Sequence, residues 1–301
     1  MSRIHEALKK AEQERAGQGS QPEAELTVTN TYAEPGAPVI RRESPPTTPN
    51  FNSASAFSFD ALLARCPQAN WSPDLKTMLF FHDEEHKYGT EEFRTLRSRL
   101  YQLRERQPLK KILVTSALPK EGKSFVSANL AQVMVRQHGR RALLIDADLR
   151  GPKLHNTLGA TPAPGLAEYL RGESDEFGVI QRGPMENLFF IPAGHANANP
   201  AELLANGRLK FLMSRLEPLF DWIIVDSPPA VPVTDGVLLS SYCDGVLMVV
   251  RSNATPFDLA RRARHEFRDK NVVGVVLNGI EEGSSPYSEY YYAAYGRPAV
   301  K

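Results

Sequence analysis

Cysteine is scarce in this chain. Only Cys66 and Cys243 occur among 301 residues, far apart and without metal-ligand companions. This count excludes a disulfide framework and predicts a reducing compartment. An excess of charge of one sign is also missing, because the formal net charge is +1. No overall field therefore favours nucleic acid or an anionic membrane, and we expect no nucleic-acid partner.

Long apolar runs are missing as well. No stretch approaches the roughly 18 consecutive apolar residues that a membrane-spanning helix needs. The first six residues, MSRIHE, contain no apolar signal core. We therefore expect a cytoplasmic chain, which another molecule must hold if it works at a membrane.

The composition predicts four segments along the chain. Residues 1–16 have the apolar spacing of a short amphipathic helix, which needs a surface to dock on. Residues 17–58 are rich in Pro, Ser and Thr without an apolar period, which predicts a disordered tether. Residues 59–281 form the folded domain, including a helix over 89–106. Residues 282–301 form a tyrosine-rich tail.

Apolar runs alternate with helical patterns from Lys110 onward, which predicts an α/β fold with a mainly parallel sheet wrapped by helices. Several runs are continuously apolar, as expected for strands buried on both faces. In such sheets ligands bind at the carboxyl ends of the strands. The expected strands are Ile112–Thr115, Ala142–Asp146, Leu188–Pro192, Trp222–Asp226, Gly245–Val250 and Val272–Asn278.

A phosphate-binding loop lies between the first strand and a helix predicted over Phe125–Gln137. The segment SALPKEGKS places Gly-Lys-Ser at the start of the helix, where backbone N–H groups and the helix dipole favour an anion. Lys123 is expected to reach the terminal phosphates and Ser124 to bind Mg²⁺. The motif departs from its usual form at Ala117, where glycine is standard. The expected nucleotide-binding residues are Ala117, Pro119, Glu121, Gly122, Lys123, Ser124 and Phe125.

Three carboxylates follow two of the predicted strands. Asp146 and Asp148 end one apolar run, and their alternation predicts that both point to the same side. Asp226 ends a second run. Any one of them could merely cap the next helix. Together with a phosphate loop they predict a site for ATP and Mg²⁺, with Lys123, Asp146 and Asp148 as catalytic residues and Ser124, Asp148 and Asp226 as metal ligands.

These motifs resemble the bacterial tyrosine kinases of polysaccharide export, and the opening peptide 1–15 resembles their exosortase-associated branch. The shared motifs are the relaxed loop Ala117–Ser124, an Asp-x-Asp-x-Arg motif at Asp146–Arg150, an Asp-Ser-Pro-Pro motif at Asp226–Pro229 and the tyrosine-rich end. The resemblance covers residues from about 88 to the end. It implies a P-loop NTPase fold of the deviant Walker A type, shared with septum-site and partition ATPases.

The resemblance also implies roles and partners. Asp146 would assist deprotonation of the incoming tyrosine, while Asp148 and Asp226 hold Mg²⁺. Glu91, Arg94 and Arg97 match a self-association motif of the family and imply a ring in which one tail enters the neighbouring site. From their spacing alone, these three residues form a charged stripe on the solvated face of a helix, with i,i+3 pairs. A separate membrane-anchored activator and a cognate phosphatase are implied as partners, with recruitment to the inner face of the plasma membrane.

Five tyrosines cluster in the tail, although tyrosine normally buries its ring. They are either an aromatic patch that docks on the domain or phosphoacceptors, and the resemblance favours phosphoacceptors.

Two other functions remain open, a positioning ATPase and a non-catalytic ATP-binding scaffold of an export complex. The first lacks its signature lysine here, since Leu118-Pro119-Lys120 occupies that part of the loop. Asn278 and Arg251 are candidates for adenine contacts. The tail tyrosines are Tyr287, Tyr290, Tyr291, Tyr292 and Tyr295.

Overall fold

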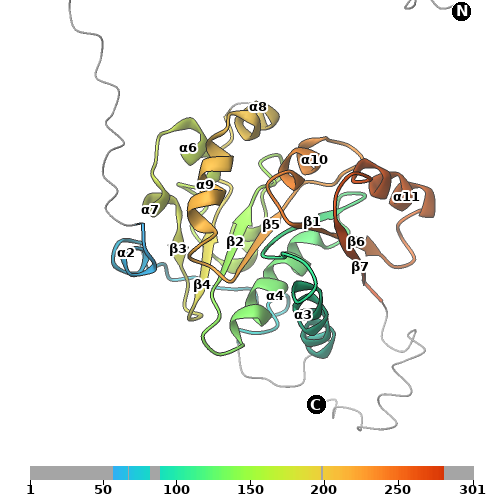
Figure 1. Ribbon diagram of the computed structural model, residues 1–301, viewed down its shortest axis with the longest axis horizontal. Helices are drawn as coiled ribbons and strands as arrows, with labels where there is room; N and C mark the ends of the chain where they lie inside the picture. Colours follow the sequence, from blue (N-terminus) through green and yellow to red (C-terminus); the bar gives the residue numbers. More distant parts are fainter. Residues whose placement is uncertain (1–56, 67, 82–88, 198, 281–301) are drawn as a thin grey trace, which may run out of the picture. The chain divides into compact units, whose positions relative to one another are not determined.

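The computed structural model describes residues 57–66, 68–81, 89–197 and 199–280 (Figure 1). All of them belong to one compact unit. The predicted N-terminal helix, nearly all of the predicted tether and the tyrosine-rich tail lie outside the described residues. Within the described part, none of the helices combines the length and the apolar character that crossing a membrane requires.

Seven strands form one sheet in the order β3-β4-β2-β5-β1-β6-β7. Every pairing is parallel except that of β3 with β4. The six predicted strands are confirmed to within a residue at each end. The seventh, β3, escaped prediction because its two residues carry no period. The strands are β1 Lys111–Ser116, β2 Ala142–Asp146, β3 Gln181–Arg182, β4 Leu188–Ile191, β5 Trp222–Asp226, β6 Gly245–Arg251 and β7 Val272–Asn278.

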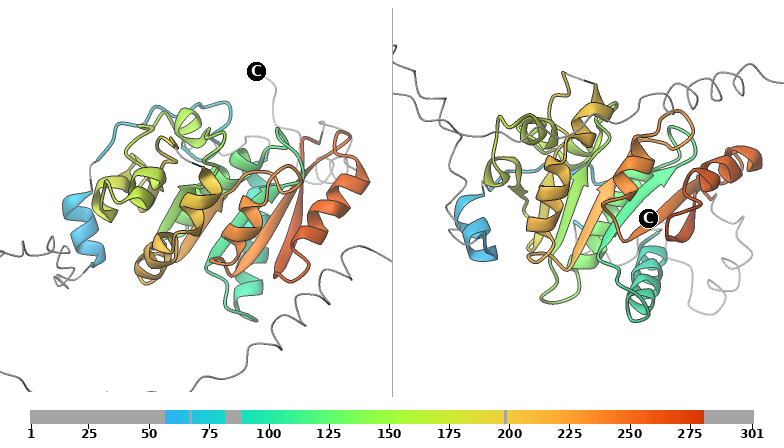
Figure 2. Two further views of the ribbon diagram at one scale, coloured as in Figure 1. Left: turned by 90° about the horizontal axis from the view of Figure 1, so that it is seen from above. Right: turned by 45° about the horizontal axis from the view of Figure 1, so that its top comes forward.

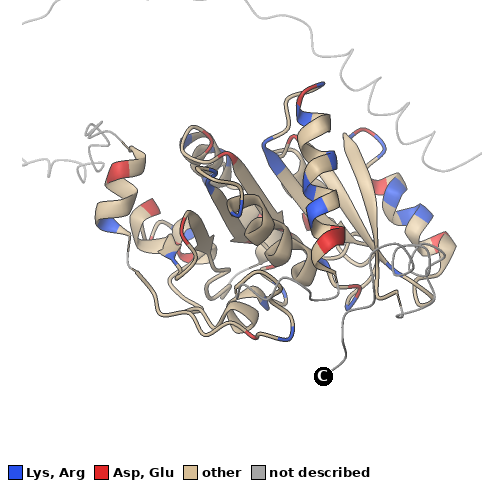
Figure 3. Ribbon diagram, turned by 90° about the horizontal axis from the view of Figure 1, so that it is seen from below, with Lys and Arg blue, Asp and Glu red and all other residues tan. Residues whose placement is uncertain are grey.

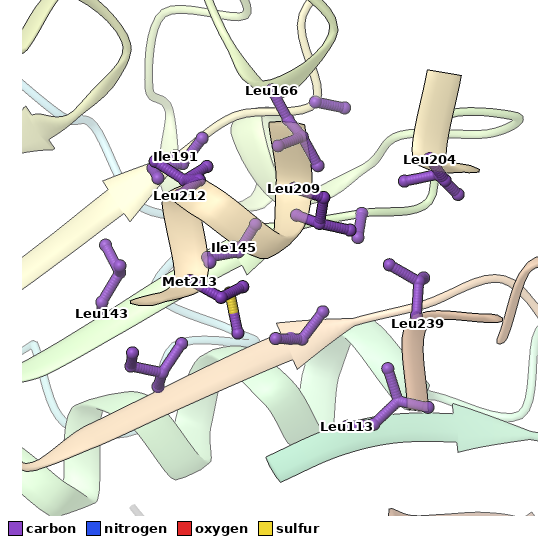
Figure 4. Close-up of a cluster of buried hydrophobic side chains, with 14 of the residues drawn as sticks. Leu113, Leu143, Ile145, Leu166, Ile191, Leu204, Leu209, Leu212, Met213 and Leu239 are labelled. Carbon is purple, nitrogen blue, oxygen red and sulfur yellow. The ribbon is translucent and has the colours of Figure 1, made fainter. Parts of the chain in front are cut away.

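Helices cover both faces of the sheet, as Figures 1 and 2 show. One apolar cluster lies under α3, α4 and α5, and the other lies under α2 and α6 to α11. Figure 4 shows part of the second cluster, where leucines of α9 meet β2 and β4. The helices are α2 Phe59–Arg65, α3 Thr90–Arg104, α4 Lys123–Val135, α5 Leu154–Leu158, α6 Leu166–Arg171, α7 Glu176–Val179, α8 Pro200–Ala205, α9 Arg208–Leu216, α10 Asp235–Ser240 and α11 Phe257–Glu266.

The strand register brings the predicted carboxylates to one edge. β2 and β5 are buried along their whole length, which explains their continuous apolar sequences. Their parallel pairing sets Asp146 directly beside Asp226, and the pairing of β5 with β1 sets Asp226 beside Val114. Since the phosphate loop follows β1, three strand ends converge on a single site.

The folded domain begins before the predicted boundary at Phe59. Phe57 packs edge-on against Phe177 with ring centroids 5.2 Å apart, and the Ser58 side chain accepts a hydrogen bond from the backbone of Ala61 as the N-cap of α2. Residues 57 and 58 were assigned to the tether, so this assignment was wrong. The composition of a Pro- and Ser-rich segment does not reveal that Phe57 packs on the domain or that Ser58 caps a helix.

The segment after α2 reaches the helix of the phosphate loop. Asn129 and Gln132 are fully buried on α4, where their side-chain oxygens accept hydrogen bonds from Leu79 N (2.8 Å) and Phe80 N (3.2 Å). Asn129 Nδ2 also donates to Thr77 O at 2.8 Å. These bonds satisfy buried amides that would otherwise be costly. They fix the segment before α3 against α4.

Candidate active site

The loop between β1 and α4 has the shape of a phosphate cradle. Gly122 is the N-cap of α4 with φ of +95°, in the left-handed region that glycine adopts readily. A Cβ added there would lie 2.0 Å from Asn278 Nδ2, so only glycine fits. The first amides of α4 therefore face the mouth of the loop without a side chain before them. This arrangement suits a bound phosphate.

The other predicted loop residues take different places. Ala117 is fully buried in the core and its carbonyl accepts from Val231 N at 3.3 Å. Pro119 is exposed. The Phe125 ring packs against Phe93, with centroids 5.8 Å apart. Any nucleotide contact by these three residues would therefore come from the backbone or, for Pro119, from the loop tip.

Lys123 lies among the three carboxylates. Its Nζ is 2.8 Å from Asp148 Oδ2, and the exposed fractions of the two side chains are 12% and 8%. Burial opposes the ammonium charge, but the charges of Asp226, Asp148 and Asp146 outweigh burial and raise the pKa of Lys123. The lysine is therefore held charged at the mouth of the loop.

Asp226 is buried and bound by hydroxyl groups. Ser124 Oγ donates to its Oδ2 at 2.6 Å, and Ser127 Oγ lies 3.0 Å from its Oδ1. Burial raises the pKa of Asp226 to about 6, although the charge of Lys123 and the Ser124 hydrogen bond work against the increase. A bound cation can therefore replace one of the serine hydroxyl groups as a partner of the Asp226 carboxylate.

Asp146 is fully buried at the end of β2. Its oxygens accept from the backbone N–H groups of Leu154 (3.2 Å) and Asp148 (3.3 Å), so this carboxylate also shapes the loop that follows. Burial, followed by the charge of Asp226, raises the pKa of Asp146. β2 ends at Asp146, and Asp148, two residues later, pairs with Lys123. The charges of both carboxylates act on Lys123, and their common orientation stays a prediction.

The donor set fits Mg²⁺. Three carboxylates face one lysine, so the site has an excess of negative charge when all are ionised, and a divalent cation would balance it. Among the described residues no group of three or more His, Cys, Asp or Glu side chains is arranged as a metal cage. Mg²⁺ bound with a nucleotide needs only one or two protein carboxylates, with phosphates and water completing the shell. Ser124, Asp148 and Asp226 can provide such a partial shell.

An ion pair ties together the two loops beside this site. Arg150 follows Asp148 on the loop after β2, and its guanidinium binds both oxygens of Asp235 at 2.7 and 3.0 Å. Asp235 begins α10 after the loop from β5 and is buried. Bidentate pairs of this kind fix geometry as well as charge. The spacing of neither motif indicates the pair, because the partners are 85 residues apart.

The raised pKa of Asp226 predicts a pH effect on stability. A carboxyl group whose folded-state pKa lies above its usual value near 3.9 favours folding at low pH, and this contribution is lost as pH rises through about 6. Without Mg²⁺ and nucleotide, the protein should lose about 2 kcal/mol of free energy of unfolding from this group between about pH 4 and pH 7. Thermal unfolding of the protein and of Asp226→Asn across this range measures the effect.

The comparison between the two proteins measures the titration of Asp226 together with its effect on Asp146, because the charge of Asp226 helps to raise the pKa of Asp146. Asp146 contributes in the same direction, and His155, whose pKa is lowered by burial, contributes in the opposite one. Both groups remain in Asp226→Asn. The variant should therefore show a flatter pH profile. Parallel profiles for the two proteins would contradict the assigned ionisation of Asp226.

Comparison with known proteins gives the site a context. No family model matches the sequence. The tyrosine-protein kinase YwqD of Bacillus subtilis is 33% identical over 211 residues, which cover 69% of this chain and 88% of YwqD. The chain belongs to the family of bacterial tyrosine-protein kinases. Among the solved structures, the kinase domain of the Escherichia coli tyrosine kinase ETK matches with a TM-score of 0.65 and 30% identity, covering 72% of this chain and 84% of that chain.

Membership of the bacterial tyrosine-protein kinases confirms the family named from the motifs, whereas its exosortase-associated branch stays a prediction. The chain spans only part of the first curated relatives, 24% of the length of the Acinetobacter johnsonii kinase Ptk and 28% of Ralstonia nicotianae EpsB. The Pyrococcus furiosus cell division ATPase MinD matches with a TM-score of 0.50 at 24% identity, covering 59% of this chain and 74% of that chain, which shows a shared fold alone. The predicted P-loop NTPase fold is thereby confirmed.

Proposed function

We propose that this chain is an ATP-dependent protein-tyrosine kinase that phosphorylates tyrosines of its own C-terminal tail, in trans within an oligomer. The observation that carries the proposal is the meeting of Lys123, Ser124 and three buried carboxylates at the phosphate loop. YwqD is similar to this chain in sequence, and the kinase domain of ETK is similar to it in sequence and fold. The proposed phosphoacceptors are Tyr287, Tyr290, Tyr291, Tyr292 and Tyr295.

Each residue of the site has a chemical role in this proposal. The loop amides and Lys123 bind the β- and γ-phosphates and stabilise the charge that develops on transfer. Mg²⁺, when bound, adds positive charge at the same oxygens. A phenol with a pKa near 10 needs a base to react near neutrality. We propose that the pair of Asp146 and Asp148 accepts the proton of the tyrosine hydroxyl. Asp148 keeps a narrow exposed edge, whereas Asp146 is fully buried.

The last strand, β7, ends near the loop that binds the phosphates. β7 ends at Asn278, whose Nδ2 donates to Glu121 O of the phosphate loop at 2.9 Å. Tyr287 follows nine residues later, a reach of about 30 Å for an extended chain. This length allows a tyrosine to enter its own site or that of a neighbouring subunit. The route is therefore a separate question, which requires an experiment with two distinguishable proteins.

The intact mass of the purified protein after incubation with Mg²⁺ and ATP tests the proposal. Phosphate added to tail peptides would support it. If none is gained, the cytoplasmic segment of a membrane activator should be added. ATP hydrolysis that continues without phosphotyrosine would refute the kinase proposal and favour a positioning ATPase.

The proposed self-association residues lie on α3, whose ribbon carries bands of basic and acidic residues in Figure 3. Arg94 pairs with Glu91 on the same helix, and both are substantially exposed. Arg97 differs, because its Nη1 donates to Val133 O near the end of α4 at 3.0 Å. Glu91 and Arg94 are thus available to a neighbouring subunit, whereas Arg97 also holds α3 on α4.

Replacing these arginines one at a time should separate the two roles. Arg94→Ala should move the protein towards monomer on a sizing column and leave the melting temperature unchanged. Arg97→Ala should do the same and also lower stability by about 1 kcal/mol, because Val133 O loses its donor. Arg99→Ala, an exposed arginine of the same helix, is the control. An unchanged elution volume for Arg94→Ala would contradict the proposed subunit contact and show that the charged residues of α3 only face the solvent.

The partners of the reaction are part of the proposal. Rhizobium meliloti ExoP, a succinoglycan biosynthesis transport protein, is 34% identical over 199 residues, which cover 60% of this chain and 25% of ExoP. By analogy we propose a role in the polymerisation and export of an exopolysaccharide. A separate membrane-anchored activator would recruit the kinase to the inner face of the plasma membrane. A cognate phosphatase would reverse the modification.

A further inference from the structure

The phosphate loop is held from outside by residues at the carboxyl ends of β6 and β7. Asn278, the last residue of β7, donates from Nδ2 to Glu121 O at 2.9 Å. The same nitrogen occupies the space that a Cβ on Gly122 would need. The amide of Asn278 therefore contacts the backbone of the loop at two consecutive residues.

A second connection reaches the loop through Glu121. This side chain is only 3% exposed, and its Oε2 accepts from Leu118 N across the loop at 2.6 Å. Its Oε1 accepts from the hydroxyl of Thr255, which itself accepts from Arg251 N at 3.0 Å. Glu121 thus connects two parts of the loop, and Thr255 connects Glu121 to the end of β6.

The loop needs such support because its backbone is unfavourable. Lys120 has φ of +66° although it is not glycine, and Gly122 has φ of +95°. Side chains with a Cβ are strained in the left-handed region. Amides that converge on one point also repel each other until an anion arrives. The cradle therefore keeps its shape only where surrounding groups hold it.

We propose that Asn278 and Thr255 are positioning residues that hold the phosphate loop in its anion-binding shape before the nucleotide arrives, and that Asn278 does not read the adenine base. The inference deepens the proposed kinase function and rests on it. It revises the prediction from the sequence, in which Asn278 and Arg251 were candidates for adenine contacts. In the structure the Asn278 amide points to the loop backbone, and Arg251 Nη1 lies 3.5 Å from Lys120 O.

Hydrogen exchange of the full chain without nucleotide is the first test. In Asn278→Ala and Thr255→Val, the amides of residues 118 and 120–124 should exchange about tenfold faster than in the unsubstituted protein. Thr255→Ser keeps the hydroxyl and should restore slow exchange. Asn271→Ala is the matched control, since Asn271 precedes β7 at its other end and donates to Asp244 O at 2.9 Å. Circular dichroism verifies that each variant is folded.

Binding of two probes separates positioning from base recognition. Mg²⁺-tripolyphosphate carries the phosphates without base or sugar, and Mg²⁺-ATP carries all three. Asn278→Ala should weaken both by the same factor of about ten. A loss confined to ATP would make Asn278 a base contact and overturn the proposal. Unchanged exchange in folded Asn278→Ala and Thr255→Val would also overturn it.

The two proposals fail in different ways. The kinase function fails if the unsubstituted protein and its activator yield no phosphotyrosine. The exchange measurement uses no nucleotide and no phosphoryl transfer, so its result stands in either case.

Discussion

Lys123→Met should reduce autophosphorylation at least about 100-fold. The ammonium lies 2.8 Å from Asp148, and the charges of Asp226, Asp148 and Asp146 all act on it. In the proposed reaction it neutralises the transferred phosphoryl group, so its loss removes stabilisation that exists chiefly in the transition state. Phosphotyrosine is measured by intact mass and by peptide mapping.

The variant needs controls because it also changes the electrostatics of the resting site. Without Lys123, Asp148 loses its cationic partner and the charge that holds down the pKa of Asp226 disappears. Thermal unfolding at fixed Mg²⁺ verifies that the fold persists. Lys120→Met is the matched variant, an exposed lysine of the same loop, and should keep its activity. Phosphotyrosine preserved in Lys123→Met would remove Lys123 from the mechanism.

The sequence predicted the sheet well because its strands carry a strong local signal. β2 and β5 are buried on both faces, and their apolar runs end at Asp146 and Asp226, where the topology places ligands. The helix over 89–106 was equally clear from its apolar spacing, and α3 spans Thr90–Arg104. In each case one property of consecutive residues decides the structure.

The interactions that shape the site depend on residues far apart in the chain. The pairs Arg150 with Asp235 and Asn278 with Glu121 join residues 85 and 157 positions apart, and no local pattern encodes them. Asn129 in the buried helix α4 was equally unpredictable, because its partners belong to the segment before α3. Polar residues in buried places signal only that partners exist. Their identity comes from the fold.

Mixing two proteins that cannot phosphorylate their own tails should restore phosphorylation if transfer is in trans. The first protein is Lys123→Met with an intact tail, and the second is an active chain whose five tail tyrosines are replaced by phenylalanine. Neither can phosphorylate its own tail. Together they should place phosphate on the tail of Lys123→Met, because the active site of one subunit meets the tail of its neighbour. Mass spectrometry distinguishes the two chains by their substitutions.

The outcome depends on self-association, which supplies an internal control. If the exposed stripe of α3 joins the subunits, adding Arg94→Ala to both proteins should reduce the transfer, because subunits then meet only by collision. Transfer should also rise with total protein concentration in that background. The reach of about 30 Å from Asn278 to Tyr287 leaves a route within one subunit physically possible. If the mixture gains no phosphotyrosine while the unsubstituted chain is fully phosphorylated, each subunit modifies its own tail.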